Sequence, residues 1–108
     1  MDYATALQVW DEFRFTSLVE LKQDLIDVAV RYARLRVDWL LAEGQKQTDI
    51  DQDRTRCHNS LIAACDILSR NMETNGEDGS WRKALGDDRR QIGDFACMLH
   101  CHLGISAR

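Results

Sequence analysis

Apolar residues between positions 18 and 43 recur at alternating spacings of three and four, and this pattern restricts the fold more than any other feature. They are Leu18, Leu21, Leu25, Val28, Tyr32, Leu35 and Trp39. Such spacing places them all on one face of an α-helix. Because the 108 residues include no proline, nothing interrupts that helix. We predict a helix over 18–43, begun by a capping box between Ser17 and Glu20 and stopped at Gly44.

A second apolar row widens the surface of this long helix. It consists of Ile26, Val30, Ala33, Val37 and Leu40. Two rows indicate a central helix that packs on two sides. A stripe of this length can exceed what the neighbouring helices of one chain cover, so a second copy of the chain is a candidate partner.

Three further segments have helical patterns. An apolar row that follows Thr48, a candidate N-cap, predicts a helix that ends at Asn75-Gly76. Residues 81–85 form at most two turns, and Asp87 or Asp88 caps a final helix that ends near Gly104. A short amphipathic helix covers 3–13, and the sequence leaves open whether it continues into the long one. No strand-like alternation occurs, so we predict an all-α fold: an antiparallel helical bundle of three main helices plus a short N-terminal helix, in a single domain over 1–108.

Charge and composition narrow the classes of partner. Fourteen Lys and Arg against 18 Asp and Glu give a net charge of −4, which disfavours general nucleic-acid binding. The acidic start of the chain does not resemble a secretory signal, and no apolar run is long enough to span a membrane. We therefore expect a cytoplasmic protein without a membrane partner, whose four cysteines are free thiols.

The densest group of chemically capable residues lies near the C-terminus. Cys97 and Cys101 are one helical turn apart and His100 flanks them, a spacing that predicts a possible zinc site. A closed zinc site needs a fourth ligand, for which the candidates are Cys57, Cys65 and His58. The alternative is that the cysteines pack as small apolar residues.

A second candidate site is a polar cavity that holds an anion. Its predicted lining residues are Arg34, Arg54, His58 and Asp94. Arg54 and His58 also invite comparison with small helical ribonuclease toxins, which carry arginine and histidine on one helix. Their spacing here does not match that pattern, and both residues equally suit the polar border of a helix.

The positions of the three tryptophans predict which of them pack in the core. Trp10 and Trp39 fall on apolar rows and are expected in the core, and Trp81 is expected to fold back onto the bundle.

Gly93 interrupts the final helix, where glycine costs roughly 1 kcal/mol relative to alanine, so a neighbour is expected to fill a notch there. The candidates for that neighbour are Tyr32, Trp39 and Trp81. The candidates for a partner of the adjacent Asp94 are Arg90, Arg54 and Arg34.

The C-terminal half resembles a small bacterial family of uncharacterised helical proteins. The resemblance lies in residues 68–72, 81–82, 86–89 and 92–97. It implies a compact helical domain of bacterial origin, and it implies no activity and no catalytic residues.

These patterns converge on no set of acid, base and nucleophile. The function we predict is therefore a non-enzymatic interaction module that self-associates into a homo-oligomer or binds another protein. A helical sensor of a small ligand or a metal is the alternative, and a ribonuclease-like toxin is a third hypothesis. No cofactor is expected besides the possible zinc.

Overall fold

A computed structural model describes residues 1–104 and confirms the all-α prediction. Its elements are the helices α1 (Tyr3–Phe13), α2 (Val19–Leu41), α3 (Gly44–Thr74) and α4 (Arg89–Leu103), and the short 3₁₀ helix η1 (Ser80–Ala84). Helices occupy 82% of the residues that the structure describes, so the fold of this part depends on helix packing alone.

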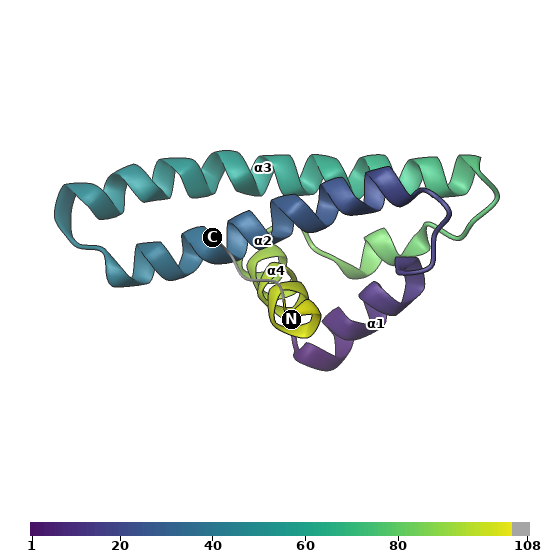
Figure 1. Ribbon diagram of the computed structural model, residues 1–108, viewed down its shortest axis with the longest axis horizontal. Helices are drawn as coiled ribbons and strands as arrows, with labels where there is room; N and C mark the ends of the chain where they lie inside the picture. Colours follow the sequence, from purple (N-terminus) through teal and green to yellow (C-terminus); the bar gives the residue numbers. More distant parts are fainter. Residues whose placement is uncertain (105–108) are drawn as a thin grey trace.

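The helices form a bundle around a long antiparallel hairpin. In Figure 1, α2 and α3 run beside each other along the long axis, and α4 is seen nearly end-on where it crosses α2. Helix α1 packs against α4 and η1. The molecule measures 48 × 23 × 22 Å because the hairpin extends well beyond this crossing.

Aromatic rings fill the part of the bundle where α1, η1 and α4 meet. The ring of Phe13 lies 4.7 Å from that of Trp81 and 6.3 Å from that of Phe95, centroid to centroid. Trp81 is buried, and its indole N–H donates to the Met72 sulfur. The prediction that Trp81 folds back onto the bundle is therefore confirmed. Burial of a tryptophan contributes strongly to stability, so this cluster anchors the short helix η1.

The predicted capping box at the start of α2 is wrong. The helix begins at Val19, and its N-cap residue Leu18 makes no side-chain capping bond. Ser17 instead donates its hydroxyl and its amide to the carboxylate of Glu77, which follows α3. This tertiary contact competes with local capping because it ties the start of α2 to the loop after α3.

The sequence predicted some of the other helix ends correctly and others incorrectly. Asp88 caps α4 by accepting from the Gln91 amide, and Gly104 ends it in the left-handed conformation, as predicted. The predicted start of the third helix at Thr48 is wrong, because α3 already begins at Gly44, which has a φ of +59°. The short α1 is separate from α2, a question that the sequence left open.

The turn between α2 and α3 is the centre of a segment that contains no buried residue. No residue from 34 to 56 is buried, although both helices continue through this segment. Two members of the second apolar row, Val37 and Leu40, are 52% and 65% exposed, so the prediction that α2 is covered on two sides is wrong at this end. Trp39, expected in the core, is only half-buried. We call residues 34–56 the hairpin arm.

Candidate functional site

The crossing of α2 and α4 brings Arg36 and Asp94 together, a pair that the sequence analysis did not predict. Gly93 is buried there, and a Cβ on it would lie 3.4 Å from Cε1 of Tyr32 and 3.1 Å from Nη1 of Arg36. The predicted notch therefore exists and is filled, with Tyr32 as one of its two occupants. Arg36 is the other, and it was not among the candidates.

Asp94 is the electrostatic centre of this crossing. Its carboxylate accepts from Arg36 Nη1 at 3.1 Å and from the Met1 ammonium at 3.1 Å. Neither is a predicted partner, so the expected pairing with Arg90, Arg54 or Arg34 is wrong. Burial acts to raise the pKa of the Asp94 carboxyl, but the hydrogen bonds from the ammonium and from Arg36 outweigh it and hold the pKa below its ordinary value.

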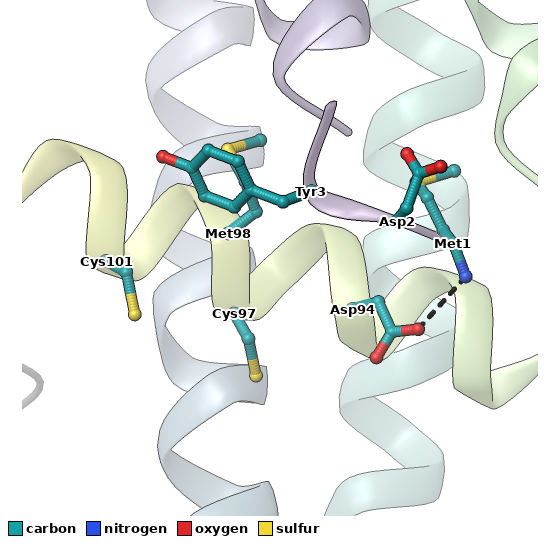
Figure 2. Close-up of a pocket in the computed structure, with 7 residues that line it drawn as sticks. All are labelled: Met1, Asp2, Tyr3, Asp94, Cys97, Met98 and Cys101. Carbon is teal, nitrogen blue, oxygen red and sulfur yellow. Dashed lines mark hydrogen bonds and ion pairs between the residues drawn. The ribbon is translucent and has the colours of Figure 1, made fainter. Parts of the chain in front are cut away.

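A cavity of about 310 Å³ adjoins this ion pair. Figure 2 shows its lining, which consists of Met1, Asp2, Tyr3, Asp94, Cys97, Met98 and Cys101. The side chains of Cys97 and Cys101 leave the same side of α4. Arg36 Nη1 lies 3.8 Å from the Cys97 sulfur, so one guanidinium group contacts both Asp94 and a thiol.

The predicted zinc ligands do not assemble as a set of three. His100 keeps its Nε2 atom buried, and this atom has no hydrogen-bond partner among the described residues. Within residues 1–104, no group of three or more His, Cys, Asp or Glu side chains is placed to hold a metal ion. Cys97 and Cys101 thus stay together on one helix face, while His100 makes no third ligand. Burial raises the pKa of the Cys97 thiol, an effect that the nearby Arg36 guanidinium opposes.

Arg54 and His58 lie one turn apart on α3, as their spacing predicted. Arg54 stacks over the Trp39 ring at 4.6 Å and pairs with Asp51 at 3.6 Å. His58 uses Nε2 in a 2.8 Å hydrogen bond with the Asp87 backbone carbonyl. Both side chains thus hold elements together, α2 to α3 and α3 to the loop before α4. This structural use gives the ribonuclease hypothesis no support.

The four predicted anion ligands occupy different environments. Arg34 on α2 has its side chain 44% exposed, and its Nε atom is 4.0 Å from Asp38. Asp94 is engaged by Arg36, and Arg54 by Trp39 and Asp51. None of the four cavities lined by described residues that we compared contains all four side chains. The anion site formed by these four residues therefore stays a prediction.

Comparison with family models, curated proteins and solved structures finds no match for this chain. The bacterial resemblance of the C-terminal half stays a hypothesis. Among residues 1–104, no helix combines the length and apolar character needed to cross a membrane.

Two features that bear on function were missed at the sequence level. One is the contact of Arg36 with Gly93. Arg36 follows Tyr32 by four residues, so the two side chains lie on the same face of α2, and this spacing could have predicted that both contact Gly93. The other is the exposed end of α2, where Leu41 is 80% and Leu40 is 65% exposed. The apolar rows had identified Leu40 and Val37 but assigned them to the wrong environment.

Proposed function

We propose that this chain is a non-catalytic interaction module that self-associates through its hairpin arm. The observation that supports the proposal is the exposure of three apolar side chains on the last turns of α2, namely Val37, Leu40 and Leu41. They lie on the arm, where no residue is buried within the chain. Two long helices that continue past the core without covering their apolar residues are suited to burying them against a partner.

A second copy of the chain suits this surface because its charges complement themselves. Arg34 and Asp38 lie on the same stripe of α2 as Val37 and Leu41, at spacings of three, four and seven. Arg34 Nε lies 4.0 Å from Asp38 within the chain, so a two-fold axis that brings two such segments together antiparallel places an arginine and an aspartate of each copy at the rim of the apolar contact. Oppositely charged partners on the rim fix the register of an interface.

The size of the apolar patch sets the strength of the association. Three side chains bury less than the roughly 800 Å² per partner that a standard stable interface uses. We therefore expect a reversible dimer with a dissociation constant in the micromolar range or weaker, so that its population depends on concentration.

Sedimentation equilibrium from micromolar to millimolar protein tests the proposal. We expect the average mass to rise from that of the monomer toward that of the dimer, and the variant Leu40→Ser with Leu41→Ser to remain monomeric. Phe15→Ser is the matched control, because Phe15 is 84% exposed but precedes α2, at the end of that helix opposite the arm. A strictly monomeric wild type, or a double variant that dimerises as well as the wild type, would overturn the proposal.

A further inference from the structure

Cys97 and Cys101 form a thiol pair on one exposed side of α4. Both are free, Cys97 half-buried and Cys101 exposed, and they line the cavity of about 310 Å³ beside the α2–α4 crossing. Residues four apart on a helix have their Cβ atoms about 5–6 Å apart, a separation that a single ion between the two sulfur atoms can bridge. Figure 2 shows both sulfur atoms on the same side of the helix.

The number of available ligands selects the kind of ion. Zinc in a structural site takes four ligands, and among residues 1–104 no third His, Cys, Asp or Glu is placed to hold a metal ion together with the two thiols, although Asp2 and Asp94 line the same cavity. Calcium and magnesium prefer oxygen ligands. Thiolates are soft ligands that favour cuprous copper, and Cu(I) is satisfied by two sulfur ligands in a linear arrangement. We propose that Cys97 and Cys101 bind one Cu(I) ion as a two-coordinate dithiolate site.

The charged groups beside the pair fit a two-coordinate Cu(I) site. Two thiolates and one Cu(I) carry a net charge of −1, which a neighbouring cation stabilises. Arg36 supplies that cation, because its Nη1 atom lies 3.8 Å from the Cys97 sulfur. The same nitrogen donates to Asp94, which holds the guanidinium group in place. Arg36 is thus a positioning residue beside the site and not a ligand.

Binding is a substitution without a redox step. One Cu(I) ion displaces the two thiol protons, two Cu–S bonds form, and two protons pass to the solvent, so copper and sulfur keep their oxidation states. The thioethers of Met1 and Met98 line the same cavity, but Figure 2 places their sulfur atoms away from the two thiols. The site therefore needs only the two cysteines.

An anaerobic titration with Cu(I) in competition with bicinchoninate tests this site. We expect the reduced wild type to withdraw one copper ion per chain from the chelator and to release two protons. Copper X-ray absorption of the loaded protein is expected to show two sulfur ligands. The single variants Cys97→Ser and Cys101→Ser are expected to lose this competition.

Two controls separate ligand loss from general damage. His100→Gln is expected to bind copper like the wild type, because His100 is not a ligand. Cys57→Ser removes a distant buried thiol and keeps a donor to the Val28 carbonyl, so it too is expected to bind. Circular dichroism checks that each variant is folded. Failure of the wild type to compete, retention of copper by the double variant Cys97→Ser with Cys101→Ser, or equally tight binding of zinc would overturn the proposal. This test does not depend on the oligomeric state.

Discussion

Tyr32 packs its ring edge against Gly93, and the two residues mark the point where α4 crosses α2. A Cβ at position 93 would lie 3.4 Å from Tyr32 Cε1, an ordinary contact, and 3.1 Å from Arg36 Nη1, a tight one. The glycine thus permits the close approach of the two helices. The contact also gives a physical reason for a glycine in a helix interior despite its conformational cost.

Substitution of Gly93 tests this contact. We expect Gly93→Leu to lower the free energy of unfolding by about 1–3 kcal/mol, because the added carbons displace Tyr32 and Arg36. We expect Gly93→Ala to change it by less than about 1 kcal/mol, because gained helix propensity offsets the tight contact with Arg36. Urea unfolding of both variants measures the difference. If leucine is tolerated as well as alanine, the close approach does not exist in solution.

Asp94 predicts a defined dependence of stability on pH. Its pKa is lowered in the folded protein, so its stabilising contribution is fully present above the carboxyl pKa of the unfolded chain, near 4, and is lost as the pH falls toward the folded value. We expect Asp94→Asn to cost about 1 kcal/mol at pH 7. This cost should shrink progressively below pH 4 as the wild type loses the same interaction.

Urea unfolding of the wild type and Asp94→Asn across this pH range measures the effect. Asp24→Asn is the control, because Asp24 is an exposed carboxylate on α2. A difference between Asp94→Asn and the wild type that stays constant down to pH 3 would contradict the assignment.

Gly79 lies where the loop after α3 turns back beneath that helix. Ser69 donates its hydroxyl to the Gly79 carbonyl at 2.8 Å, and a Cβ on Gly79 would lie 2.3 Å from the Ser69 backbone oxygen. Since backbone atoms of a helix cannot move aside cheaply, we expect Gly79→Ala to destabilise the protein by about 1–3 kcal/mol. Thermal and urea unfolding report this loss, and Ser80→Ala, at an exposed neighbour, should stay close to the wild type.

Arg82 joins three parts of the chain with one guanidinium group. It pairs with Asp66 of α3 at 2.6 Å, donates to the Leu85 carbonyl at 2.7 Å and pairs with Asp87. Lysine has a single ammonium group and cannot reproduce this planar set of donors. We expect Arg82→Lys to cost about 1 kcal/mol in urea unfolding, because the carbonyl of buried Leu85 loses its donor while the carboxylates of Asp66 and Asp87 are 41% and 74% exposed and can bind water instead.

Arg56→Lys is the control for this substitution. The Arg56 side chain is 79% exposed and pairs with Asp53 one turn away on the same helix, so its replacement should change the free energy of unfolding by less than about 0.5 kcal/mol. Equal effects of the two substitutions would show that the bridging by Arg82 adds no stability.

The site was only partly predictable from the sequence, because some of its contacts join residues close together in the sequence and others join residues far apart in it. Cys97 and Cys101 lie on one face because both belong to the same helix, so their spacing was sufficient to pair them. His100 is on the same helix, but among residues 1–104 it does not join the two cysteines in a group placed to hold a metal ion. Arg36 reaches Asp94 across 58 positions of sequence, a pairing that no local pattern contains.

The sequence by itself determined where the helices form. Apolar spacing identified α2 to within two residues at its C-terminal end, and Asp88 and Gly104 mark both ends of α4 through bonds within a few residues. These signals are local because a helix makes its hydrogen bonds and arranges its faces within a few turns. The tertiary structure alone decided how the helices cross, and therefore which apolar residues are covered. Leu25 and Leu40 belong to similar apolar rows, yet one is fully buried and the other 65% exposed, because α4 crosses α2 at Tyr32 and Arg36 and leaves the last turns of α2 uncovered.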